Sequence, residues 1–366
     1  MKIETTLEKI KDAVSRIQKV SAKNLSLPIL ENVLITVKDS VMTLRVTNLH
    51  VGTEITVPVK VIKEGEIAVK IDVFSSIINS LGNEHKVILD QQENNLHIST
   101  EKSDMNIKLY PHADFPTLPR VEDASELMVD IETLIQGVQS VVYSASLSDI
   151  KPEISSVYIY PENNELVFVA TDSFRLAEKR IVAKGVNDFG GVIIPVKNIQ
   201  ECLKIFLGIS GDVSLKIGKN QLSIDSEDIY FTSRIVDGNY PDYKQIIPNE
   251  SKTDVVVLKD ELIKSLRLVN VFSDNFNQIL VKTNSEKGVL DIHSRNTDVG
   301  ENNTAIDAAI TGEGIEMYLN HKYLTDVFSA TYTDSIQFSF TEKNKPCIVR
   351  SVGDSSFLYL IMPMNR

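Results

Sequence analysis

The side chains that could act as catalysts or metal ligands are numerous, but their spacing matches no catalytic motif. The histidines at positions 50, 85, 97, 112, 293 and 321 lack the spacing of a metal site. Cys202 and Cys347 form no C-x-x-C pair, and the sequence has no P-loop, no dinucleotide-binding glycine motif, no H-E-x-x-H and no nucleophile elbow. We therefore expect no catalytic residue, no metal site and no cofactor.

The elements that could position a binding site recur with a domain-sized period of about 125 residues. A short strand at 2–5 precedes apolar residues spaced for one face of a helix, and similar pairs begin with strands at 127–131 and 255–258. The three apolar faces consist of Leu7, Ile10, Val14 and Ile17; of Leu134, Val138 and Val141; and of Leu262, Leu266 and Val269.

Two hairpins and a second helix complete each copy. The first hairpins turn at 38–40, 161–165 and 284–288, the second helices lie at 72–81, 196–207 and 320–330, and the last hairpins turn at 91–95, 218–220 and 342–345. This pattern predicts three tandem domains, at residues 1–124, 125–251 and 252–366. Because hairpins dominate, the expected fold class is α+β, with largely antiparallel sheets and two helices on one face of each domain.

The composition is that of an ordinary globular protein, with 42% apolar and 24% charged residues among 366. No apolar run approaches the ~18 residues that crossing a bilayer requires. The first residues, MKIETTLEKIKDAV, lack the apolar core of a signal peptide, and two cysteines are too few for a disulfide scaffold. We expect a cytoplasmic protein without a membrane partner.

The net charge of −12 conceals an uneven distribution. The six predicted helical stretches together carry +3, which leaves −15 for the strands and loops. In the first helix Lys9, Arg16 and Lys23, with Lys19 on the same side, form a stripe away from the apolar face. Such a stripe is a solvated helix face or, in a repeated domain, a surface that follows a phosphate backbone without reading bases.

Two further segments are unusual. In ATDSFRLA, residues 170–177, an apolar strand ends in Thr-Asp-Ser and a Phe-Arg-Leu follows, which is typical of a strand-to-loop junction with a paired arginine. The chain ends in LYLIMPMNR, whose methionines either fill a core or line an adaptable apolar groove. On pattern alone the structural role is favoured for both segments.

Four motifs, added to the three copies, resemble a known family. They are LPIL at 27–30, ATDSFRLA at 170–177, VDGNYPDY at 236–243 and the terminal MPM at 362–364. The whole chain is similar to the bacterial DNA polymerase III beta subunits, the DNA sliding clamps. The resemblance implies a non-catalytic processivity factor: a head-to-tail homodimer whose six domains form a ring, with helices lining a hole for duplex DNA and sheets outside.

The resemblance also implies a groove between the second and third domains that binds a short apolar motif. Its expected partners are the DNA polymerase III alpha subunit, the clamp loader, and other polymerases and repair proteins. The matching positions are Ile154, Thr171, Ser173, Phe174, Arg175, Leu176, Pro241, Ile246, Pro346, Leu360, Met362, Pro363 and Met364. Apolar walls would bury the anchors of the partner, and Arg175 would orient it.

This chain departs from the family pattern at the groove. Ser173-Phe174 stands where many members have Gly-His or Ser-His, Gln245 where some have arginine, and Asn365 precedes the basic Arg366. The aromatic side chain makes that corner of the groove more apolar.

The remaining positions implied by the resemblance concern DNA and the ring interface. The DNA-facing candidates are Lys9, Arg16, Lys19, Lys23, Asn24, Lys151 and Lys197. The ring interface is expected at an edge strand of the first domain with Met105 and Ile107, and at a helix end of the third domain with Val271 and Phe272. Two alternatives remain: a β-rich docking scaffold that does not encircle DNA, and, less favoured, an enzyme whose site is assembled from distant residues.

Overall fold

The computed structural model describes residues 1–20, 27–82, 84–122, 124–183 and 189–365. The chain folds into two compact units, one formed by Met1–Ile135 with Lys197–Asp237 and the other by Gln136–Val196 with Gly238–Arg366. The first copy of the repeat thus lies in one unit, the third copy lies in the other, and the middle copy contributes strands to both.

Among its described residues, the first unit contains an eight-stranded sheet, a five-stranded sheet, two complete helices and all but the first residue of a third. Its elements are β1 (Lys2–Thr6), α1 (Leu7–Ile17), β2 (Asn32–Lys38), β3 (Val41–Thr47), β4 (Val51–Pro58), β5 (Lys60–Lys63), β6 (Gly65–Lys70), α2 (Ile71–Ser80), β7 (Lys86–Gln92), β8 (Asn95–Ser99), β9 (Asp104–Lys108), β10 (Ser125–Asp130), α4 (Val196–Ile205), β15 (Asp212–Ile217), β16 (Gln221–Asp225) and β17 (Ile229–Arg234).

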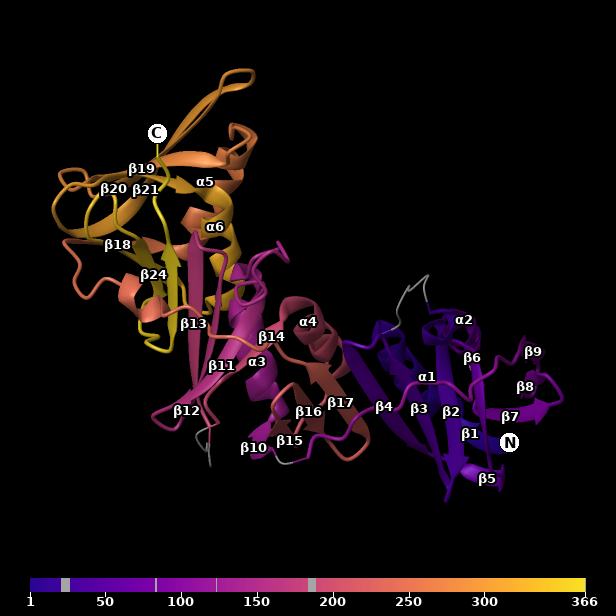
Figure 1. Cartoon of the computed structure of the whole chain (residues 1–366). Coiled ribbons are helices and arrows are strands. Elements are labelled where there is room, and N and C mark those ends of the chain that lie inside the picture. The colour runs from indigo at the N-terminus through magenta and orange to yellow at the C-terminus, as the bar shows by residue number, and fades with distance from the viewer. Residues whose placement is uncertain (21–26, 83, 123, 184–188, 366) are drawn as a thin grey trace. The chain divides into compact units, whose positions relative to one another are not determined.

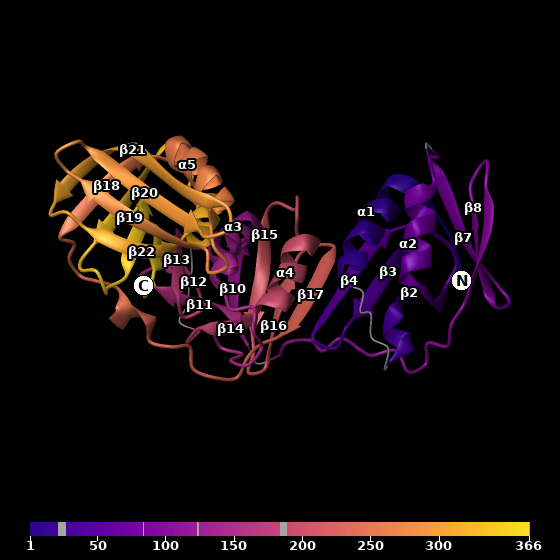
Figure 2. The same cartoon turned by 90° about the horizontal axis from the view of Figure 1, so that it is seen from above.

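The eight-stranded sheet combines two copies of the repeat, in the order β10-β15-β16-β17-β4-β3-β2-β6. The copies join where β4 pairs antiparallel with β17, from Val51 opposite Ser233 to Ile55 opposite Ile229. Figure 2 shows α1 and α2 side by side over strands of the first copy. The predicted apolar face of α1 is buried as expected, so the 3.6-residue period correctly identified the side that packs on the sheet.

The second unit contains a twelve-stranded sheet. Its elements are α3 (Ile131–Val141, which begins in the first unit), β11 (Ser156–Glu162), β12 (Glu165–Thr171), β13 (Arg175–Val182), β14 (Val192–Pro195), β18 (Thr253–Leu258), α5 (Lys259–Val271), β19 (Gln278–Asn284), β20 (Val289–Asn296), β21 (Gly300–Gly312), β22 (Glu316–Asn320), α6 (His321–Asp326), β23 (Ser335–Phe340), β24 (Cys347–Ser351) and β25 (Phe357–Ile361).

This sheet also joins two copies of the repeat. Its order is β14-β11-β12-β13-β25-β24-β23-β18-β21-β20-β19-β22, and the last strand of the chain, β25, pairs antiparallel with β13 of the middle copy. In Figure 1 the yellow C-terminal strands lie beside β13. The pairing brings the C-terminal tail to the start of β13, where residues 170–177 form the end of a hairpin.

The predicted hairpins and helices are present, with shifted bounds. Asp39 and Ser40 have φ of 48° and 65°, and Asn163 and Asn164 have φ of 52° and 61°, the left-handed conformation of tight two-residue hairpin turns. Pro161 therefore belongs to β11 and not to the turn. The predicted helix at 320–330 is α6 followed by the 3-10 turn Val327–Ala330.

Candidate functional site

The C-terminal tail and the start of β13 line an open hollow of about 360 Å³ in the second unit. Four of the predicted groove residues lie there: Phe174, Met362, Pro363 and Met364. Three further lining residues, Asn320, Tyr323 and Asn365, were not in the predicted set. Phe174 is 62% exposed, an unusual presentation for a large aromatic side chain.

Backbone hydrogen bonds fix the tail in place. The Met362 N–H donates to the Phe174 carbonyl at 2.8 Å, and the Met364 N–H donates to the Tyr318 carbonyl of β22 at 2.8 Å. The amide Nε2 of Gln278 donates to the Asn365 carbonyl at 2.9 Å. These bonds hold residues 362–365 between the β12–β13 turn and the edge of β22, so Met362 and Met364 have a defined position at the wall of the hollow.

The β12–β13 turn is held by the side chains of its own residues. The Asp172 carboxylate accepts the N–H groups of Phe174 and Arg175 at 2.9 and 3.0 Å. The Thr171 hydroxyl accepts the Ser173 N–H at 3.1 Å and donates to the Arg175 carbonyl at 2.6 Å. Ser173 adopts a left-handed φ of 78°, which turns the chain sharply before Phe174.

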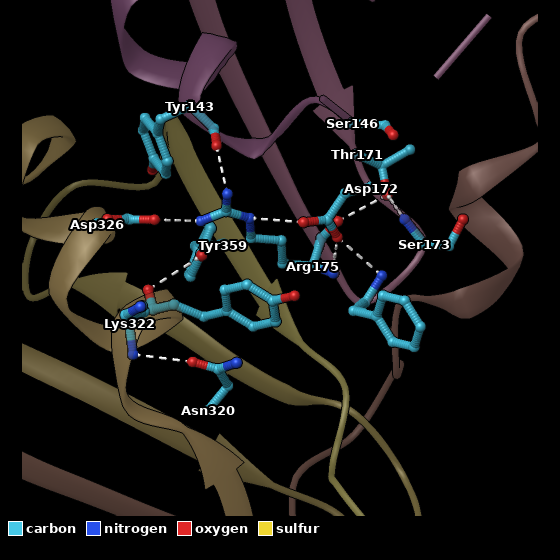
Figure 3. Close-up of polar contacts among 12 residues, drawn as sticks. Tyr143, Ser146, Thr171, Asp172, Ser173, Arg175, Asn320, Lys322, Asp326 and Tyr359 are labelled. Carbon is cyan, nitrogen blue, oxygen red and sulfur yellow. Dashed lines mark hydrogen bonds and ion pairs between the residues drawn. The ribbon is translucent and has the colours of Figure 1, made fainter. Parts of the chain in front are cut away.

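Arg175 connects this turn to two other elements of the same unit (Figure 3). Its Nε donates to Asp172 at 2.9 Å, its Nη2 donates to the Tyr143 carbonyl at 2.6 Å, and its Nη1 forms a short ion pair with Asp326 at the end of α6. The guanidinium carbon lies 4.6 Å from the ring centroid of Tyr323. Burial acts to lower the pKa of Arg175, but Tyr359, Asp326 and Asp172 raise it above the ordinary value.

These contacts differ from the expected role of Arg175. The side chain is only 11% exposed, and its donors bind groups of the chain itself. The guanidinium is paired with two carboxylates and a carbonyl, and its role in orienting a partner stays a prediction. The sequence pattern alone, which favoured a paired arginine at this junction, described the residue correctly.

Most of the other predicted groove residues form the floor beneath the tail or lie outside the hollow. Leu176 and Leu360 are fully buried in a cluster with Val167, Val169 and Tyr243, and Met362 packs against it. Thr171 and Pro346 are also buried. The exposed or half-exposed Ile154, Ser173, Pro241 and Ile246 do not line the hollow itself.

A polar network holds the 3-10 turn Tyr243–Ile246, near the end of the second copy, against this floor. The hydroxyl of Tyr243 lies 2.8 Å from that of Tyr160 and forms a short hydrogen bond to the buried Glu178. Burial and the Glu178 carboxylate raise the pKa of Tyr243, so the phenol stays protonated and acts as the donor. Glu178 in turn accepts Arg180 Nε at 2.7 Å.

The predicted basic stripe is only partly available. Lys9 and Lys19 are exposed, whereas Arg16 is 15% exposed at its side chain and donates through Nη1 to the Ile205 and Leu207 carbonyls at 2.6 and 2.9 Å. The prediction that Arg16 points outward is therefore wrong. This arginine caps the C-terminal end of α4, where carbonyls without helical partners attract a cation.

The remaining DNA-facing candidates are spread over both units. Lys197 is exposed in the first turn of α4, and Lys151 is exposed in a loop of the second unit. Lys23 and Asn24 lie outside the described residues. A hollow of about 800 Å³ beside α1 is lined by acidic groups, among them Glu8 and Asp12, as well as by Lys9, so the exposed side of α1 is mixed in charge rather than uniformly basic.

The residues expected at a ring interface lie on one sheet edge and at one helix end. β9 is the outer strand of the order β5-β1-β7-β8-β9. Ile107 in β9 is 5% exposed and belongs to the core, and Met105 is half-buried. Their part in a ring interface stays a prediction. At the end of α5, Val271 is 59% exposed and Phe272 half-buried, and Phe276, not predicted, is 73% exposed.

Among the described residues, no cluster of three or more His, Cys, Asp or Glu side chains is arranged to hold a metal ion. Within those same ranges, no helix is both long and apolar enough to cross a membrane.

Comparison with known proteins gives one consistent result. Residues 1–119, 128–242 and 244–365 match, in order, models for the N-terminal, central and C-terminal domains of the DNA polymerase III beta subunit. The beta sliding clamp of a Synechocystis species is 28% identical over 388 residues, covering 100% of this chain and 99% of that protein. The beta sliding clamp of Streptococcus pneumoniae is 26% identical over 94% of each chain. The crystal structure of the Thermotoga maritima DNA polymerase III beta subunit has a TM-score of 0.94 at 26% identity, covering 100% of this chain and 99% of that one.

Proposed function

Because the chain belongs to the family of DNA polymerase III beta subunits, the sliding clamps, we propose that it encircles duplex DNA and holds a polymerase on its template. The observation that carries the proposal is the consecutive match of all three clamp domains over residues 1–119, 128–242 and 244–365. The protein is then a non-catalytic processivity factor in the cytoplasm, and its retention on DNA is topological.

Ring closure requires two complementary edges on one chain, and the fold supports such a pair. β9 pairs on one side only, with β8. In β21 the residues from Gly300 to Asp307 pair with β20, whereas β18 pairs only with residues 308–312. Unpaired edges invite strand addition. In a head-to-tail dimer, β9 of each subunit would pair with β21 of the other. Both unpaired edges of each chain would then have a partner strand, and the two identical contacts would close the ring.

Exposed lysines support sequence-independent DNA binding. Lys9 and Lys19 present ammonium groups without fixed geometry, which suits screened attraction to phosphates and sliding rather than base recognition. The acidic remainder of the chain, with a net charge of −12 overall, repels DNA from other surfaces.

The hollow beside the C-terminal tail serves as the docking site for the polymerase alpha subunit, the clamp loader and other partners. Its aromatic and thioether lining suits aliphatic and aromatic anchors of a short peptide, because methionine adapts its shape to the side chain that it contacts.

Negative-stain imaging of the purified protein at several concentrations tests the ring. Closed rings with a central hole are expected. Compact monomers at every concentration would favour the alternative, a docking scaffold that binds peptides through its groove without encircling DNA.

A further inference from the structure

The hollow has two walls that come from distant parts of the chain. One wall is Phe174, carried by the β12–β13 turn. The other includes Asn320 and Tyr323, carried by the N-terminal end of α6. The separation of these walls determines which side chain fits between them, so whatever connects the turn to α6 also sets the shape of the site.

The Arg175 guanidinium makes that connection. Asp172, which holds the Phe174 N–H, accepts Arg175 Nε at 2.9 Å, and Asp326, three residues after Tyr323, pairs with Nη1. The same planar group lies against the Tyr323 ring, 4.6 Å from its centroid. One rigid fork thus contacts both walls, and a flexible ammonium could not reproduce this geometry.

Asp326 is the last residue of α6, and the chain continues directly into the 3-10 turn Val327–Ala330. The side chain of Asp326 is 41% exposed, and the Arg175 guanidinium is paired with it. The local charge of one guanidinium with two carboxylates is negative, so the cluster does not present a free positive charge to a ligand.

We infer that Arg175 is a positioning residue of the docking site, which with Asp172 and Asp326 holds Phe174 and Tyr323 at a fixed separation before any partner binds. This inference rests on the proposed docking function. Because Phe174 and Tyr323 are already held in place, peptide binding does not have to pay the entropy cost of ordering them. The affinity of the site therefore depends on Arg175 even if the peptide does not contact it.

The test is a titration with a short fluorescent peptide that carries leucine and phenylalanine anchors and no charged side chain. Asp326→Ala and Arg175→Lys should each weaken binding about fivefold to tenfold, the effect of one or two side chains that must be ordered on binding. Asp334→Ala, which removes an exposed carboxylate elsewhere in the same unit, is the matched control and should change affinity less than about twofold.

A direct contact between Arg175 and the partner predicts a different pattern. Arg175→Lys would then keep most of the affinity, and Asp326→Ala would leave it unchanged or strengthen it by freeing the cation; either result overturns the inference. A double mutant tests whether Asp326 acts through Phe174. When Phe174 is already alanine, the free energy of binding lost on Asp326→Ala should be at most half of that lost in the wild-type background. If the two substitutions instead reduce affinity independently, so that their fold-changes multiply, Asp326 does not act by positioning Phe174. Circular dichroism at the assay temperature shows whether each variant is folded. If the wild-type protein fails to bind, the docking function itself is refuted; if only the Asp326 effect is missing, the positioning role alone is refuted.

Discussion

Replacing Phe174 by alanine should weaken peptide docking without weakening the fold. The residue is 62% exposed, which for a phenylalanine side chain of ~200 Å² leaves ~120 Å² in contact with water. If a partner anchor covers half of that area, ~60 Å² is buried, and at about 25 cal/mol per Å² the contact contributes ~1.5 kcal/mol, roughly a tenfold change in dissociation constant. The backbone bonds that hold the turn do not involve the ring, so they survive the substitution.

Fluorescence anisotropy with the apolar peptide measures the effect, and thermal unfolding provides the control. We expect Phe174→Ala to lose about tenfold in affinity and Phe174→His, which keeps an aromatic ring at this position, to lose less. The unfolding temperature should be unchanged within error, because an exposed ring contributes little to the core. Affinity within twofold of wild type, with the fold intact, would show that the partner does not cover this ring.

Three other outcomes follow from the first unit. Lys9→Glu with Lys19→Glu should lower polymerase processivity and its salt tolerance while peptide affinity stays unchanged, as measured by primer extension and anisotropy; loss of both would indicate damage to the fold. Arg16→Ala should lower the free energy of unfolding in urea by ~1–3 kcal/mol, because the carbonyls at the end of α4 lose a charged donor; a neutral result would mean that water replaces the guanidinium. Burial raises the pKa of Glu201 to about 7, against the opposing effects of Lys204 and Asn48. The folded state therefore favours the protonated carboxyl, and the free energy of unfolding falls as pH rises from about 4.5 through about 7. Glu201→Gln should make this decrease smaller by ~1–2 kcal/mol, a figure that allows for the partial exposure of the side chain. Urea unfolding of both proteins at about pH 5 and about pH 8 measures the difference. Parallel pH profiles of the two proteins would contradict this assignment.

The repeat was predictable because each copy encodes its own local pattern. The apolar face of α1 and the polar turn at Asp39-Ser40 follow from the 3.6-residue and two-residue periods of the sequence. The sequence could not predict that strands of two copies join in one sheet, because β4 and β17 show the same alternating pattern as any other strand. Glu54 of β4 illustrates the difficulty. Its charge suggests a solvent-facing position, yet it is 6% exposed because Arg45 and Arg120 pair with it from both sides.

The candidate site was predictable only in part, for a similar reason. Phe174 and the terminal methionines were identified through their resemblance to a family motif, and the structure brings them together. Tyr323 and Asp326 belong to a helix about 150 residues away in sequence from Arg175, and no local spacing links them.

The central claim, that the chain encircles DNA, is tested most directly by topology. The protein is loaded onto a nicked circular duplex by a clamp loader, unbound protein is removed by gel filtration, and the circle is then cut once with a restriction enzyme. A sliding ring should remain with the intact circle and leave the linear product, while blocking both ends of the linear DNA should restore retention. Equal retention on open linear and circular DNA would contradict encirclement and indicate ordinary surface binding.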